Sequence, residues 1–160
     1  LYIALFCFVV FLQIAKLKRF NFFKTALCSE KPEPWNPEPK PNNTFATNET
    51  IYVYAEIFGW KYVLVDQLLH RNLTLSIKIL DSEGKTVSSQ LDTLDDKHEV
   101  PSGRFGTSRY FGFLEAGNYT VEVEVTDHNS GETITWKEEL EVIDTDSDTA
   151  LTFKEEELFR

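Results

Sequence analysis

The sequence predicts an all-β domain, an antiparallel sandwich of about seven strands, preceded by an apolar helix and a proline-rich linker. Three observations support this prediction. Apolar and polar residues alternate through residues 44–143, turn sequences separate the alternating stretches at hairpin spacing, and residues 31–41 hold five of the six prolines. The 160 residues suffice for one domain with an appendage, and the formal net charge of −10 excludes a general nucleic-acid binder.

The N-terminal segment, residues 1–28, differs from the rest of the chain in charge and hydropathy. Gln13 is the only strongly polar side chain in residues 1–15, and residues 1–29 contain no Asp or Glu but four bases. We expect residues 1–28 to form a helix that anchors the protein in a membrane. A cleavable signal peptide and a buried core helix are the alternatives. The bases between Lys16 and Lys24 leave the membrane orientation open.

The proline-rich segment, residues 29–43, is predicted to be a stalk. Its prolines lack the N–H group that helices and sheet ladders need, so an extended polyproline II conformation is favoured. Such a stalk would separate the domain from the anchor. A ligand for a proline-recognising domain is the alternative.

The strands of residues 44–143 follow from period-two patterning, in which one face of each strand is buried and the other is wetter. The clearest alternation covers residues 51–58, 73–80 and 119–126. A further strand is expected at 134–142, and weaker ones at 86–94 and 107–114. Residues 81–85 and 127–131 have the composition of turns between strands.

The run Leu114-Glu115-Ala116-Gly117-Asn118-Tyr119-Thr120-Val121 resembles the corner L-x-x-G-x-Y-x-V of immunoglobulin-like and fibronectin type III-like domains. The following VEVEVTDHNSGETITWKEELEV is similar to the last hairpin of prokaryotic surface modules of this kind. The runs NETIYVYAEI and LTLSIKILDSEGKTV resemble early strands of those modules and of macroglobulin-type domains. The resemblance implies an Ig-like sandwich over 44–143, with the Tyr119 hydroxyl tied to the corner backbone. Residues 29–160 contain no cysteine, so no disulfide joins the sheets.

Residues 58–71, FGWKYVLVDQLLHR, are less regular than the flanking strands. One interpretation is a loop that covers the core. The other is a surface that contacts a partner, with Phe58, Trp60 and Tyr62 as aromatic anchors.

Four N-x-S/T sequons, none with a central proline, occur at Asn42, Asn48, Asn72 and Asn118. If glycosylated, they place the domain outside the cytoplasm. Asn42 and Asn48 border the predicted stalk, whereas Asn72 and Asn118 can equally be ordinary turn residues.

The acidic tail, residues 144–160, carries oxygen ligands at the spacing of an EF-hand calcium loop. Asp144, Asp146, Asp148 and Glu155 fall on positions 1, 3, 5 and 12. Thr149 replaces the glycine expected at position 6, and the preceding WKEELEVI reads as a strand rather than a helix. The alternative is a solvated tail with a short helix at 152–159.

No catalytic motif is recognisable, because the three histidines are scattered singly and no nucleotide-binding or nucleophile-elbow pattern occurs. We expect a non-enzymatic, membrane-anchored, extracytoplasmic or cell-surface glycoprotein whose Ig-like domain binds protein partners or assembles with itself. No cofactor is expected apart from the calcium considered above. A pilin-like filament subunit or an accessory subunit of a membrane complex is one alternative, and a calcium-responsive surface domain is another.

Overall fold

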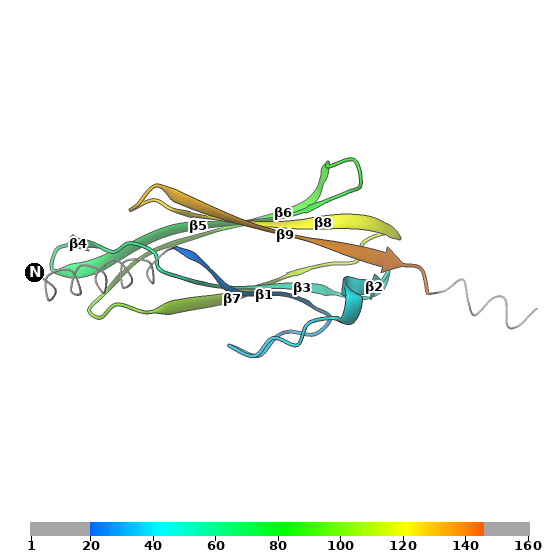
Figure 1. The fold of residues 1–160 in the computed structure, drawn as a ribbon, viewed down its shortest axis with the longest axis horizontal. Coiled ribbons are helices and arrows are strands. Elements are labelled where there is room, and N and C mark those ends of the chain that lie inside the picture. Colours follow the sequence, from blue (N-terminus) through cyan, green and yellow to red (C-terminus); the bar gives the residue numbers. More distant parts are fainter. Residues whose placement is uncertain (1–19, 146–160) are drawn as a thin grey trace, which may run out of the picture.

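The computed structural model describes residues 20–145, and these form a sandwich of two β-sheets (Figure 1). Within this range there are nine strands and one short 3-10 turn, η1 (Pro41–Asn43). The strands are β1 (Asn21–Cys28), β2 (Thr44–Ala46), β3 (Ile51–Phe58), β4 (Val63–Val65), β5 (Leu68–Leu80), β6 (Thr86–His98), β7 (Arg104–Phe111), β8 (Gly117–Asp127) and β9 (Glu132–Ile143).

One sheet has three strands in the order β1-β3-β7, and all its pairs are antiparallel. The other has six strands. There β9, β8 and β5 pair antiparallel in that order, and β2 adds to β9 as a short parallel strand. Strand β6 pairs with the edge of β5 that does not face β8. Strand β4 pairs with residues 68–70 of β5, which precede the residues that pair with β8. This is the two-layer sandwich expected from the sequence, but with nine strands in residues 20–145 instead of about seven, because β1 and the short strands β2 and β4 add to those that the alternation marked.

The core lies between the two sheets, and it is formed by the alternate residues that each strand directs inward. The predicted inward faces at 51–58, 73–80 and 119–126 are confirmed, because their side chains are at most 3% exposed, apart from Tyr119 at the start of β8. In β3 the outward Tyr54 and Glu56 are buried as well, so the second face of that strand is not the wetter one that was predicted. The buried aliphatic members are Leu27, Ile51, Val53, Ala55, Ile57, Leu73, Leu75, Ile77, Ile79, Val121, Val123, Val125, Leu140 and Val142. Burial of this apolar surface, without a disulfide in the described residues, stabilises the sandwich.

The corner that precedes β8 confirms the resemblance on which the fold prediction depended. The Tyr119 hydroxyl donates a hydrogen bond to the main-chain carbonyl of Glu115, with 3.0 Å between the two oxygens. Both predicted hairpin turns also form. Gly84, in the 81–85 turn, and Gly131, at the end of the other, have positive φ angles of 79° and 77°, a conformation that glycine adopts without steric cost.

The prediction of a helix over residues 1–28 is wrong for residues 21–28, which form β1. This strand pairs with β3 from Asn21–Phe58 to Cys28–Tyr52, and Leu27 is buried in the core. Residues 1–19 lie outside the described part of the chain. Between residues 20 and 145 no helix is long and apolar enough to cross a membrane.

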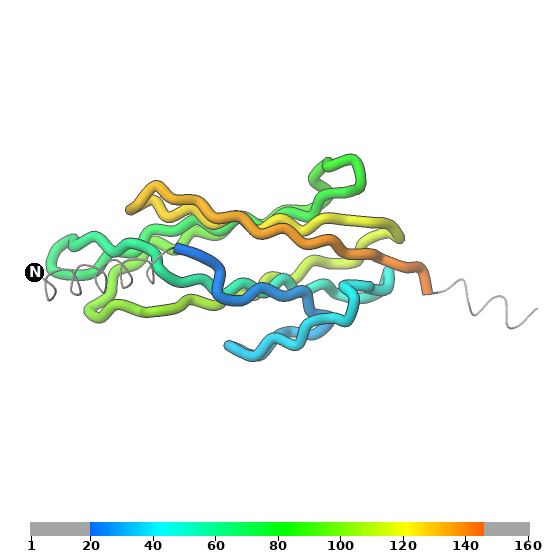
Figure 2. The backbone as a smooth tube through the Cα atoms, viewed as in Figure 1, coloured from blue at the N-terminus to red at the C-terminus, as the bar shows by residue number. Residues whose placement is uncertain are grey.

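The prediction that residues 29–43 form a stalk between an anchor and the domain is also corrected. These residues connect β1 to β2 within the sandwich, and they lie along the outer side of the three-stranded sheet (Figure 2). The Lys40 amide donates to the Leu27 carbonyl at 2.7 Å, and Pro37 is buried. Because prolines lack a ladder donor, the segment stays outside both sheets while remaining packed on one of them.

Candidate binding face

The outer surface of the three-stranded sheet carries several aromatic side chains, in one set of contacts around Arg104 and a second between Tyr52 and Tyr110. In β3, Ile51, Val53, Ala55 and Ile57 face the core, so the residues between them face outward. Outward side chains of β1 and β7 and one side chain from the 29–43 segment complete the group. We call this surface the aromatic face; its residues are Phe23, Trp35, Tyr52, Tyr54, Phe58, Arg104 and Tyr110.

Three side chains of the aromatic face are largely exposed. Phe23, Trp35 and Tyr110 keep 58%, 54% and 65% of their surface accessible. Phe23 lies at a register shift between Phe22 and Lys24, which directs its ring outward against Phe58. Trp35 has a φ of 66°, in the left-handed region that a non-glycine residue rarely adopts. Local backbone irregularities therefore present two of the three exposed rings.

Arg104 joins the exposed rings to a buried acid. Its guanidinium lies 4.3 Å from the centre of the Phe23 ring and 5.8 Å from that of Trp35. It also donates to Glu56 Oε1 at 2.7 Å, and the Glu56 side chain is only 2% exposed. The Arg104 cation thus compensates a buried carboxylate and stacks against aromatic rings on the surface.

Tyr54 lies behind Trp35 and completes this network. Its hydroxyl donates to Glu56 Oε2 at 3.2 Å, and the residue is 3% exposed. Burial, and then the neighbouring Glu56 carboxylate, raise the pKa of Tyr54 above its ordinary value. The phenol therefore stays protonated and continues to act as a donor at neutral pH.

A pocket of about 310 Å³ opens beside Trp35 on this face. Its walls include Pro32 and Pro34 from the proline-rich segment, Tyr54 from β3, and residues 106–108 of β7. Gly106 has no side chain to fill the space: a Cβ placed there would lie 3.2 Å from the Tyr54 hydroxyl oxygen and 3.4 Å from the Trp35 ring. The absence of a side chain at residue 106 therefore lets the Trp35 ring and the Tyr54 hydroxyl pack directly over β7 at one wall of the pocket.

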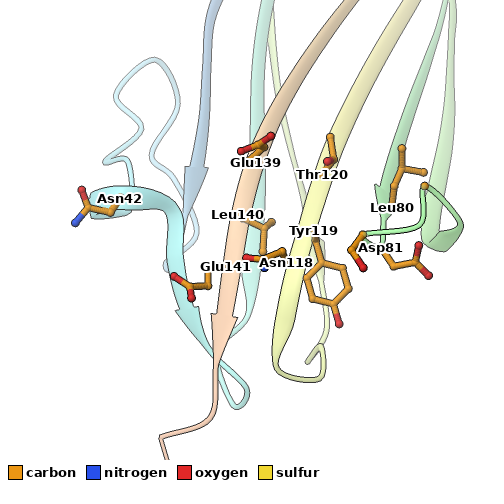
Figure 3. Close-up of a pocket in the computed structure, with 11 residues that line it drawn as sticks. Asn42, Leu80, Asp81, Asn118, Tyr119, Thr120, Glu139, Leu140 and Glu141 are labelled. Atoms are coloured by element: carbon orange, nitrogen blue, oxygen red, sulfur yellow. The ribbon is translucent and has the colours of Figure 1, made fainter.

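A second hollow, of about 490 Å³, lies at one end of the six-stranded sheet (Figure 3). Tyr119, Glu139 and Glu141 line it, and so do two sequon asparagines, Asn42 and Asn118. The Tyr119 hydroxyl is already bound at the corner. This hollow has a polar, acidic lining and no cluster of exposed aromatic rings, so the aromatic face is the stronger candidate for a contact surface.

The predicted partner anchors Phe58, Trp60 and Tyr62 do not form one surface. Trp60 is 7% exposed and belongs to the core, so its prediction as a contact residue is wrong. Gly59, with a φ of 81°, lets the chain turn after β3, and the Trp60 ring packs under the Arg71 guanidinium at 5.3 Å. Tyr62 is half-buried beside Trp60, and its hydroxyl accepts a bond from the Ser102 amide.

Phe58 does lie on the aromatic face, half-buried against Phe23. Sequence reasoning missed Phe23, Trp35, Arg104 and Tyr110. Two of them fall in segments predicted to be anchor and stalk. The available signal was the tryptophan between two prolines in residues 34–37, a residue type with a large apolar area to bury.

The glycosylation sequons occupy different environments. Asn42, Asn48 and Asn118 are exposed, whereas Asn72 is half-buried within β5. The exposed sites are sterically open to modification, and their glycosylation stays a prediction.

The predicted calcium ligands fall at the limit of the structure. Asp144 is exposed just after β9, and Asp146, Asp148 and Glu155 lie outside the described residues. Among residues 20–145 there is no group of three or more His, Cys, Asp or Glu side chains that could hold a metal ion. The histidines remain separate: His70 contacts Asp95, His98 contacts Asp96, and His128 bonds to Thr74.

One comparison with a solved structure supports the fold. No protein-family model matches the chain, and no curated protein matches it. Among solved structures it is similar to the C-terminal domain of wzt, with 8% identity and a TM-score of 0.54, over 79% of this chain and 74% of that one. A CARDB domain from Pyrococcus furiosus matches more loosely, with 11% identity and a TM-score of 0.37 over 78% and 91% of the two chains. The described part of the chain is an all-β sandwich domain, and its fold is similar to that of the C-terminal domain of wzt.

Proposed function

We propose that this chain is a non-enzymatic binding module that holds a protein partner on the aromatic face. The observation that carries the proposal is the exposure of Phe23, Trp35 and Tyr110 on one face of the sandwich. Large exposed apolar clusters are rare on monomeric proteins unless they bind something. Tryptophan, tyrosine and arginine are the side chains that contribute most to protein–protein contacts, and this face combines all three.

The outer face of the other sheet has the opposite character. Its exposed and half-buried side chains include threonines, serines and an ion-paired group in which Glu122 contacts both Lys78 and Lys137. Lys137 lies 2.6 Å from Glu122 and, through its hydrogen bond, holds the pKa of that carboxyl below its ordinary value. This face also exposes the aliphatic side chains of Val87 and Leu91, but within residues 20–145 it has no aromatic group with which to anchor a partner.

The proposal includes a location at the outer side of a membrane. The apolar composition of residues 1–15 supports an anchor within residues 1–19, and the exposure of Asn42, Asn48 and Asn118 is compatible with glycosylation there. In this arrangement the sandwich itself begins at β1, so the anchor would continue directly into a strand of the domain.

Site-specific photo-crosslinking tests this function. A benzoylphenylalanine placed at Phe23 or at Tyr110, in the full chain in its native membranes, should capture the same protein from both positions. The matched control is Thr135, which is exposed on the outer face of the other sheet. Capture at all three positions alike, or at Thr135 only, would contradict the proposal, and so would capture at none.

A further inference from the structure

Strand β7 is an edge strand, because the three-stranded sheet runs β1-β3-β7. Along an antiparallel strand, every second residue directs both main-chain groups toward the same side. The Tyr110 carbonyl accepts a bond from Gln90 Nε2 at 2.6 Å, and the Ser108 carbonyl from Arg109 Nη1 at 2.8 Å. Since β3 occupies the other side of β7, these even-numbered residues face the free edge.

The other two even-numbered residues of β7 differ from each other. The Arg104 carbonyl accepts a bond from the Ser102 hydroxyl at 3.3 Å. The Gly106 carbonyl has no side-chain donor among residues 20–145. Side chains therefore protect the free edge of β7 at three of four positions, and the exception is the residue that forms a wall of the pocket. Exposed strand edges are usually protected because they pair readily with other chains.

An added strand also needs contacts for its side chains, and the pocket beside Trp35 provides them. An extended peptide directs alternate side chains to one face, and here that face meets Trp35, Tyr54 and the pyrrolidine rings of the proline-rich segment. Lys31 and Glu33, which also line the pocket, carry opposite charges. Because these charges offset each other, the pocket is complementary to an uncharged, apolar side chain rather than to an acidic or basic one.

We propose that the Gly106 edge and the pocket beside Trp35 receive an extended peptide segment of the partner protein. The peptide pairs its main chain with the amide and carbonyl of Gly106, and an apolar side chain enters the pocket that Trp35, Pro32 and Pro34 line. This inference rests on the proposed function and specifies the form of the partner: an exposed strand or tail with an apolar residue. Affinity comes from the main-chain bonds and selectivity from the pocket, as in other strand additions.

The test selects peptides from a phage library of random linear dodecamers on the immobilised full chain. The selected peptides should share an apolar residue, and Trp35→Ala should weaken their binding at least tenfold. Gly106→Val should weaken it at least as much, because the new side chain enters the space next to the Tyr54 hydroxyl and the Trp35 ring. Gly112→Ala is the matched control, since no atom lies within 4 Å of a Cβ there. Its binding should equal that of the wild type.

Amide hydrogen exchange provides a readout that does not depend on how the variants fold. On peptide binding the Gly106 amide should exchange at least tenfold more slowly, because the peptide carbonyl accepts its hydrogen. Three results would each overturn the inference. They are an unchanged exchange rate at the Gly106 amide, selected peptides whose affinity for Trp35→Ala equals that for the wild type, and a library that yields no binder. If any of these results occurs while photo-crosslinking at Phe23 and Tyr110 still captures one protein, the peptide site is refuted. The proposed function then still holds.

Discussion

Replacing Arg104 by methionine tests the network that supports the aromatic face. Methionine keeps much of the apolar stem beside Phe23 but removes the guanidinium that donates to Glu56 at 2.7 Å. The Glu56 carboxylate is 2% exposed, so water cannot readily replace the lost donor. Within residues 20–145, only the Tyr54 hydroxyl, at 3.2 Å, would continue to bond to it.

The expected cost follows from these contacts. A hydrogen bond to a charged group contributes about 1.5–3 kcal/mol, and removing one partner of a fully buried ion pair costs about 3–5 kcal/mol. The Arg104 side chain is itself half exposed, which places the expected loss near the lower of these ranges, at about 2–3 kcal/mol. The double variant Arg104→Met/Glu56→Gln should recover part of this loss, because it also removes the unpaired charge.

Urea unfolding at pH 7, followed by tryptophan fluorescence, measures this effect. Arg109→Met is the matched control, since Arg109 is on the same strand and pairs with Asp92 at 2.6 Å, where both side chains are about one-third exposed. A pair of this kind contributes about 0–1 kcal/mol. If Arg104→Met costs no more than Arg109→Met, the reasoning about Glu56 is wrong.

Three further predictions concern the sandwich. Tyr119→Phe removes the corner hydrogen bond and should cost about 1 kcal/mol in the free energy of unfolding, whereas Tyr110→Phe, on an exposed ring, should change it little; equal effects would contradict the role of the corner. The hydrogen bond from Arg71 lowers the pKa of Asp96, so Asp96 contributes stability above the ordinary carboxyl pKa of about 4, and this stability is lost as pH falls through the lower folded pKa. Asp96→Asn should therefore destabilise the protein at pH 7, and the loss should shrink as pH falls below about 4 in urea titrations; a loss that does not change with pH would refute this. Burial raises the pKa of the Cys28 thiol, so in a Cys7→Ser background Ellman's reagent should react with it only on unfolding, and rapid reaction in the folded state would contradict its position.

The sandwich was predictable because its strands keep a strict period of two. Alternation at 73–80 and 119–126 reflects the burial of one face only, and the turn sequences fix where each hairpin reverses. The tyrosine corner was predictable for a local reason, since its donor and acceptor are four residues apart. Such features depend on contacts near in sequence or on patterns repeated along a strand.

The aromatic face was not predictable because it depends on contacts between distant segments. The run NFFKTALC continues an apolar N-terminal segment and gives no sign that β3 would pair with it. Trp35 reaches the sheet only because the proline-rich segment lies along β7, some seventy residues later in the chain. Of the two interpretations of residues 58–71, the one that covers the core holds for Trp60, because the turn at Gly59 places its ring in the core and not on a contact surface.

The most direct test of the central claim is the affinity of the cross-linked partner for two single variants of the full chain. Trp35→Ala removes a ring of the aromatic face, and Thr135→Ala changes the polar outer face of the other sheet. We predict at least a tenfold rise in Kd for Trp35→Ala and an unchanged Kd for Thr135→Ala. An unchanged Kd for Trp35→Ala, with a loss of binding in Thr135→Ala, would show that the partner binds the opposite side of the sandwich.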